Sequence, residues 1–85
     1  MHVEYSGLIA RLTGANSDQF SMQAGDNVEN LLKKVLSRHE ALAKGKSALF
    51  IAVNRKALPA HLSAWRQQLL YDGDRVMITV RIIGG

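Results

Sequence analysis

The chain has 85 residues, 47% of them hydrophobic, and eleven Lys and Arg against seven Asp and Glu give a net charge of +4. This length and apolar content predict one small domain with a single core. The sequence contains no cysteine, which excludes disulfides, a thiolate nucleophile and thiolate metal ligands. No apolar run approaches the roughly 20 residues that cross a bilayer, and residues 1–5 do not begin a secretory signal, so we expect a cytoplasmic protein without a membrane partner.

The first part of the chain predicts two short strands. Residues 2–9 begin as an alternation of polar and apolar residues that becomes less regular towards Leu8, and residues 13–18 form a cluster of residues that favour turns. A second alternation over residues 19–23 places Phe20 and Met22 on one face of a strand. The two segments are therefore predicted to pair as a hairpin.

The region from Asp26 to Gly45 predicts the clearest helix of the chain. Asp26 is a favourable N-cap residue, and Glu29 stands three positions later, where its side chain can complete a capping box. Gly45 suits the C-terminal cap. The apolar positions follow a period of about 3.6 residues and include Val28, Leu31, Leu32, Val35, Leu36 and Leu42.

The second half of the chain predicts a buried strand, an irregular segment and a final strand. Residues 48–53 are continuously apolar, which is typical of a buried strand. Residues 57–70 lack a regular pattern, and we expect a short edge strand or a helical turn there. Leu62, Trp65, Leu69 and Leu70 are expected to fold back onto the core. The Asp-Gly-Asp sequence at residues 72–74 turns the chain into a last strand over residues 76–83.

The last strand defines the two faces of the predicted sheet. One helix covers only one face of a sheet, so the opposite face stays partly open, and an open apolar face is typical of a docking surface. The fold class is therefore predicted to be α+β, with a mixed sheet packed on one main helix. The covered face of the last strand should carry Val76, Ile78, Val80 and Ile82, and the open face Met77, Thr79, Arg81 and Ile83.

Three short segments make the chain resemble a known family. They are Val53-Asn54, the segment from Leu70 to Val76 with its Asp72-Gly73-Asp74 turn, and the terminal Gly84-Gly85. In this order, together with the capped helix, they look like the ubiquitin-like β-grasp sulfur carriers. That family includes the small subunit of molybdopterin synthase (MoaD-like) and the thiamine-pathway carrier (ThiS-like). The resemblance covers the whole chain, and it implies a β-grasp domain of four or five strands over residues 1–83 with a flexible tail at residues 84–85.

The resemblance implies a carrier rather than an enzyme. An E1-like adenylating partner would use ATP and magnesium to activate the Gly85 carboxylate, a sulfur donor protein would convert it to a thiocarboxylate, and a large catalytic subunit would receive the sulfur. Gly84 and Gly85 suit this role because a tail without side chains fits a narrow active site. The chain itself is then expected to bind no cofactor and no metal. Its length and long helix favour the molybdopterin branch, whereas the approach to the tail over residues 79–83 is closer to the thiamine type.

The residues expected to bind these partners lie on the last strand. Met77, Thr79 and Ile83 belong to the predicted open face, where they offer apolar contact. Arg75 and Arg81 flank the same strand, and each is expected to pair with an acidic group of the activating enzyme.

Other functions stay open from the sequence. A ubiquitin-like modifier would be conjugated to other proteins through Gly85, and a non-covalent interaction module would use the fold without any acyl chemistry. A nucleic-acid binder would use the positive charge, but Lys and Arg are spread along the chain and are not interleaved with aromatics, so no nucleic-acid partner is predicted. The histidines His2, His39 and His61 are too widely spaced to predict a metal site, and His39 is expected to lie partly buried at the helix end.

Overall fold

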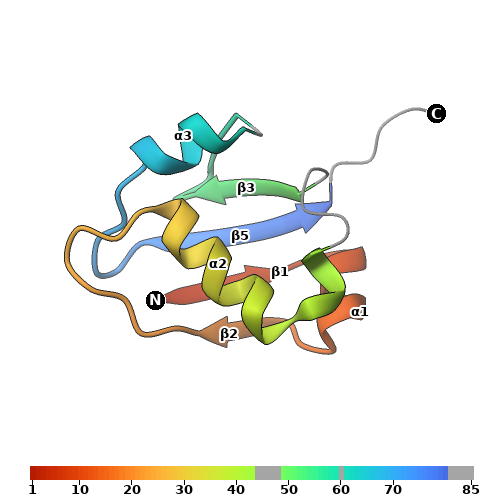
Figure 1. The fold of residues 1–85 in the computed structure, drawn as a ribbon. Helices are drawn as coiled ribbons and strands as arrows, with labels where there is room; N and C mark the ends of the chain where they lie inside the picture. The colour runs from red at the N-terminus through yellow and green to blue at the C-terminus, as the bar shows by residue number, and fades with distance from the viewer. Residues whose placement is uncertain (44–48, 60, 81–85) are drawn as a thin grey trace.

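The computed structural model describes residues 1–43, 49–59 and 61–80 (Figure 1). Within these ranges no helix has the length and apolar character needed to cross a membrane. The elements follow the chain in the order β1 (His2–Tyr5), α1 (Leu8–Thr13), β2 (Ser17–Gln19), α2 (Val28–Arg38), β3 (Leu49–Val53), β4 (Lys56–Ala57), α3 (Leu62–Gln67) and β5 (Arg75–Val80).

The strands form one mixed sheet in the order β2-β1-β5-β3-β4, so the last strand lies in the middle. β5 pairs in parallel with β1 and antiparallel with β3, and the two outer pairs are also antiparallel. Helix α2 crosses one face of this sheet (Figure 1). The predicted α+β class, with a mixed sheet on one main helix, is therefore confirmed.

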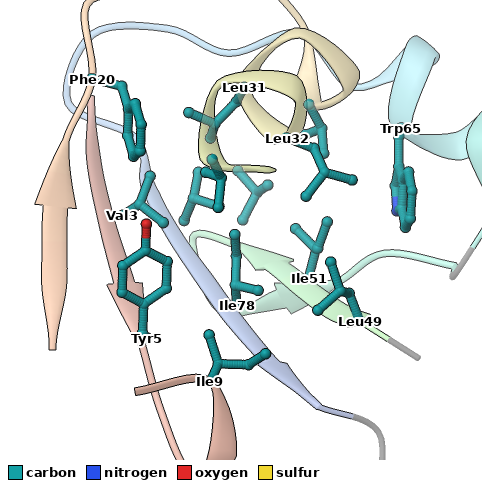
Figure 2. Packing of buried hydrophobic residues seen from close by; sticks show 14 of the residues in the cluster. Val3, Tyr5, Ile9, Phe20, Leu31, Leu32, Leu49, Ile51, Trp65 and Ile78 are labelled. Carbon is teal, nitrogen blue, oxygen red and sulfur yellow. The ribbon is translucent and has the colours of Figure 1, made fainter. Parts of the chain in front are cut away.

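The core lies between α2 and the covered face of the sheet. Leu31 and Leu32 of α2 lie over Ile51 and Ile78 of the sheet, and Ile9 of α1 closes one end (Figure 2). Each fully buried side chain of this kind contributes about 1.5–3 kcal/mol of hydrophobic free energy relative to exposure. The predicted covered face of the last strand is confirmed for the positions the structure describes: Val76 and Ile78 are buried, and Val80 packs against the core at its edge.

The connection between the first two strands differs from the prediction. The strand predicted over residues 2–9 ends at Tyr5, and α1 follows it. Gly7 (φ 59°) and Gly14 (φ 70°) bound this helix in the left-handed region, which glycine occupies without steric cost. Over so few residues a helical spacing of leucines is hard to distinguish from a strand pattern, which explains the error.

The second strand is also placed differently. β2 covers Ser17–Gln19 rather than residues 19–23, and it still pairs antiparallel with β1 as predicted. Phe20 is buried and Met22 packs against the core, but both lie outside the strand. The predicted hairpin partner of the first strand is therefore confirmed, whereas the predicted bounds of the second strand, with Phe20 and Met22 inside it, were wrong.

Helix α2 begins one residue later than predicted. Its N-cap is Asn27, whose side chain accepts from the Asn30 backbone, while the Asn30 side chain accepts from the Asn27 backbone, both at 2.9 Å. Asp26 is unavailable for this role because its carboxylate accepts from the Gln23 backbone in the preceding turn. Glu29 does not form the predicted capping box, since its carboxylate lies 3.1 Å from Arg66 of α3.

The helix is shorter than the apolar period indicates. It ends at Arg38, with His39 as its C-cap, and a short 3₁₀ turn at residues 40–43 follows. This turn still buries Leu42, so the apolar period identified a core residue outside the α-helix. The predicted C-cap Gly45 lies outside the described residues.

The segment predicted to be irregular holds both alternatives expected there. β4 forms a short edge strand, and α3 forms a helical turn capped by His61, whose Nδ1 accepts from the Ala64 backbone at 3.2 Å. Trp65 of α3 and Leu70 are buried, which confirms their predicted place in the core. Leu62 and Leu69 are exposed, so the same prediction was wrong for these two leucines. The strand predicted over residues 48–53 is confirmed from Leu49 to Val53.

Candidate functional site

The face of the sheet turned away from α2 is the candidate docking surface, and we call it the open face. Side chains alternate between the two faces of a strand, so the residues between the core positions of β1, β3 and β5 point to this side. The strand register places Met77 opposite Ala52 and Glu4. The open face thus comprises His2, Glu4, Phe50, Ala52, Arg75, Met77 and Thr79.

Met77 is the apolar centre of the open face. It is 41% exposed, which is unusual for a large hydrophobic side chain in the middle strand of a sheet. A shallow hollow of about 190 Å³ lies beside it, and both Arg55 and Arg75 line this hollow. Neither arginine forms an ion pair with another described residue. An apolar centre with cations at its edge suits a protein surface that is apolar and bordered by acids.

A hydrogen-bonded clamp fixes the beginning of β5. The Asn54 side chain donates to Asp74 Oδ1 at 2.9 Å and accepts from the Arg75 backbone at 3.0 Å. The other Asp74 oxygen accepts from the Tyr71 backbone at 2.8 Å, which closes the turn around Gly73 (φ 88°). Two of the three segments that carry the family resemblance therefore meet in space, and together they set where β5 starts.

The far end of β5 leads towards the predicted tail. Leu49 of β3 is the register partner of Val80, the last described residue of β5. The predicted site residues Arg81, Ile83, Gly84 and Gly85 lie outside the described residues, as does Ile82, and their roles stay predictions. Of the predicted partner-binding residues, the structure brings Arg75, Met77 and Thr79 together on the open face.

A cluster of polar side chains joins the edge of the sheet to the end of α2. The Asp18 carboxylate accepts from the Tyr5 hydroxyl at 2.9 Å and contacts His39 Nε2 at 2.6 Å. Arg38 lies 3.5 Å from the same carboxylate and stacks over Phe20, with its guanidinium carbon 4.1 Å from the ring centre. His39 is partly buried as predicted, but its pairing with Asp18 joins residues 21 positions apart, which no sequence spacing signals.

This cluster shifts the pKa of two of its members. Burial raises the pKa of Asp18, but hydrogen bonds from His39 and Tyr5 and the nearby positive charges outweigh it, and the pKa lies below its usual range. Burial, together with the hydrogen bond to Asp18, holds the pKa of Tyr5 well above its usual range. The fold therefore favours an ionised Asp18 and a neutral Tyr5.

His2 of β1 lies beside a second and larger hollow. His2 Nδ1 lies 2.7 Å from Gln19 Nε2, and His2 Nε2 lies 3.5 Å from the Glu4 carboxylate. His39 and His61, the other two histidines, are more than 30 positions away in the sequence. Among residues 1–43, 49–59 and 61–80, no three His, Asp or Glu side chains are arranged to hold a metal ion. An open hollow of about 650 Å³ lies beside the 72–74 turn, at the end of β5 opposite to Val80.

No family model matches this chain, and no curated protein matches it.

The fold is shared with several solved structures. A protein described as molybdopterin converting factor, subunit 1, from Pyrococcus furiosus aligns over 95% of both chains, with a TM-score of 0.78 and 22% identity. The small archaeal modifier protein 1 from Methanosarcina acetivorans covers 99% of this chain and 94% of its own, with a TM-score of 0.78 and 19% identity. A chain of the complex of subunits 1 and 2 of the molybdopterin-converting factor from Helicobacter pylori covers 99% and 96%, with a TM-score of 0.60 and 21% identity. These likenesses confirm the ubiquitin-like β-grasp fold.

Proposed function

We propose that the chain is a cytoplasmic sulfur carrier whose Gly85 carboxylate is adenylated by an E1-like enzyme and then converted to a thiocarboxylate. The observation that carries this proposal is the position of β5. It is the middle strand of a β-grasp sheet, it bears the exposed centre of the open face, and it leads within five residues to Gly84-Gly85. A partner that holds the open face thereby also holds the base of the tail.

The chemistry explains why the tail ends in glycine. A carboxylate is a poor electrophile, and joining it to AMP supplies a good leaving group. A Gly85 carboxylate oxygen attacks the α-phosphorus of ATP and pyrophosphate leaves; a sulfide equivalent from the donor then attacks the acyl carbon and AMP leaves. The partner must surround the reacting carbonyl closely, and side chains at residues 84 and 85 would obstruct it. The chain acts as a co-substrate in these steps, while ATP and magnesium belong to the adenylating enzyme.

The fold comparisons favour the molybdopterin branch over the thiamine branch. Two of the solved structures with this fold are described as parts of a molybdopterin converting factor, and one of them comes from a complex of its subunits 1 and 2. By analogy we propose a large catalytic subunit as the partner that receives the sulfur, in addition to the adenylating enzyme and the sulfur donor protein.

A protein modifier is the second candidate function. The observation that favours it is the equally good superposition on the small archaeal modifier protein 1. In that function the adenylated Gly85 would be transferred to lysine side chains of other proteins. Both functions need the same activated carboxylate and differ in the acceptor.

The intact mass of the chain distinguishes these functions. The protein is incubated with an E1-like enzyme from the same organism, ATP, magnesium and a sulfur donor. A sulfur carrier gains the mass of one oxygen-to-sulfur exchange, whereas a modifier produces covalent ladders on lysines of other proteins. The control is a chain lacking Gly85, which should undergo neither reaction. If that shortened chain keeps full activity in cells, the interaction module without covalent chemistry is correct and the proposal is wrong.

A further inference from the structure

Helix α1 carries two exposed leucines that the core does not use. Leu8 is 52% exposed and Leu12 is 46% exposed, although Ile9 between them is buried. Leu8, Arg11 and Leu12 stand at positions i, i+3 and i+4, which places them on one side of the helix. Arg11 is also exposed and has no ion-pair partner among the described residues. The outer side of α1 is therefore apolar with one cation, and we call it the α1 patch.

The α1 patch lies at the end of the sheet from which the tail departs. α1 packs against β5, and in Figure 1 it lies at the end of the sheet to which the β5 arrow points. The Ser6 backbone donates to the Ile78 carbonyl at 3.2 Å, and a Cβ atom at Gly7 would stand 3.8 Å from the Thr79 hydroxyl. Since Thr79 belongs to the open face, the base of α1 borders that face directly.

The length of the tail limits where an enzyme that acts on Gly85 can stand. Five residues follow Val80, and a fully extended chain of that length spans at most about 18 Å. An active site that encloses the terminal carboxylate must therefore lie within this distance of the end of β5. Because α1 packs against β5, a protein-sized partner at that distance is near enough to contact α1 as well.

We propose that the α1 patch is a second docking element for the adenylating enzyme, continuous with the open face. The surface that receives it is apolar and bears a carboxylate facing Arg11. This inference rests on the proposed function, because it takes the enzyme that activates Gly85 as the occupant. The patch would add to the contacts that the open face makes with the enzyme near the end of β5.

The test is the carrier dependence of ATP–pyrophosphate exchange catalysed by each E1-like adenylating enzyme of the same organism. The variant Leu8→Gln/Leu12→Gln keeps good helix formers and should raise the KM for the carrier about ten- to a hundredfold, because half-exposed leucines lose their apolar partner. The kcat should stay unchanged, since docking contacts are the same in the ground and transition states. The matched control is Leu62→Gln/Leu69→Gln, whose leucines are 44% and 42% exposed but do not belong to the α1 patch. This control should keep the wild-type KM.

A second variant tests the charge without removing a leucine. Arg11→Glu should raise the KM at low salt, and the effect should shrink at high salt, as expected for an exposed ion pair. Lys33→Glu, an exposed charge reversal on α2, is its control.

The outcomes separate the inference from the function on which it rests. A wild-type chain that supports no exchange with any of these enzymes contradicts the proposed function, and the inference with it. A wild-type chain that is active, with an unchanged KM in both the leucine and the Arg11 variants, contradicts the inference alone. Sedimentation showing a wild-type dimer that becomes monomeric in the leucine variant would assign the patch to a second copy of the chain, which also overturns it.

Discussion

The two faces of β5 differ in what they contact, although their residues alternate along one strand. Val76 and Ile78 are buried against the core that α2 covers, whereas Arg75 and Met77 are exposed on the open face. Neighbouring residues thus differ in role: those on the covered face stabilise the core, whereas those on the open face are the ones that we propose to bind a partner. The comparison teaches that these two properties can be changed separately by substitutions one position apart.

The largest effect is expected from the covered face. Ile78 is only 1% exposed at the centre of the core, so Ile78→Ala should lower the free energy of unfolding by about 2–5 kcal/mol. Urea denaturation followed by circular dichroism measures this loss. Met77→Ala, its neighbour on the open face, is the control and should change stability by less than about 0.5 kcal/mol. An equal loss of unfolding free energy in both variants would show that the two faces of β5 contribute equally to stability, which contradicts the comparison.

The clamp at the start of β5 should have the next largest effect. Asn54→Ala removes hydrogen bonds to Asp74 and to the Arg75 backbone, and it places alanine at a φ of 51°. We expect a loss of about 1–3 kcal/mol in the free energy of unfolding. Asn54→Gly keeps the backbone conformation but not the hydrogen bonds, so it separates the two causes. A variant with glycine as stable as the wild type would show that the hydrogen bonds do not hold the strand.

The Asp18 cluster predicts a dependence of stability on pH. Because the fold lowers the pKa of Asp18, its ionised form stabilises the native state above its unfolded pKa of about 3.9. That stabilisation is lost as the pH falls through the lower pKa of the folded state. Asp18→Asn should cost about 1–3 kcal/mol at pH 7 and should flatten the stability profile between about pH 5 and pH 2. Urea titrations at a series of pH values measure it, and a variant profile parallel to the wild type would contradict it.

Ionisation of Tyr5, in the same cluster, is expected to lower the stability of the fold at alkaline pH. The fold raises the pKa of its hydroxyl, so the neutral form stabilises the native state below the unfolded pKa of about 10, and stability falls as the pH rises beyond it. Tyr5→Phe removes the titrating group and should abolish this alkaline loss in the same urea titrations. An unchanged alkaline loss in the variant would assign it to another residue.

The smallest effect on stability, and a clear effect on binding, is expected on the open face. Arg75→Glu should change the free energy of unfolding by less than about 0.5 kcal/mol, because the side chain is exposed and has no ion pair among the described residues. Its affinity for the adenylating enzyme should fall about tenfold at low salt, and less at high salt. Binding measured by isothermal titration calorimetry at two salt concentrations tests this. Lys33→Glu on α2 should leave the affinity unchanged. If Lys33→Glu lowered the affinity as much as Arg75→Glu, the net charge of the chain and not the position of Arg75 would determine binding.

The sequence predicts the two elements whose pattern is long enough to be read. The alternation around Val76 and Ile78 and the helical period from Val28 to Val35 each extend over several residues, and both match the structure. These two patterns together are sufficient to predict a sheet that has one face covered by a helix and one open face. They also place Met77 on the open face, because side chains of adjacent strand residues point in opposite directions.

The features that the sequence did not reveal depend on local competition or on tertiary contacts. Asp26 and Asn27 are equally good N-cap residues, and the choice between them is made by the turn that engages the Asp26 carboxylate. The Asp18 cluster joins residues of β1, β2 and the end of α2, so it exists only after folding. The exposure of Leu8 and Leu12 is set by the way α1 packs on β5, which the spacing of the leucines alone does not determine.

Because β1 pairs in parallel with β5, the sheet forms only when both ends of the described chain are present. His2 pairs with Arg75 and Tyr5 with Ile78, so the middle of the sheet joins segments from near the two ends of the sequence. Contacts between such distant segments form late, since a long loop must close before they contribute any free energy. A copy cut or terminated before β5 therefore lacks the middle strand of the sheet, together with the residues that we propose to be activated. We expect such a copy to stay unfolded and not to compete with intact molecules for the proposed partners.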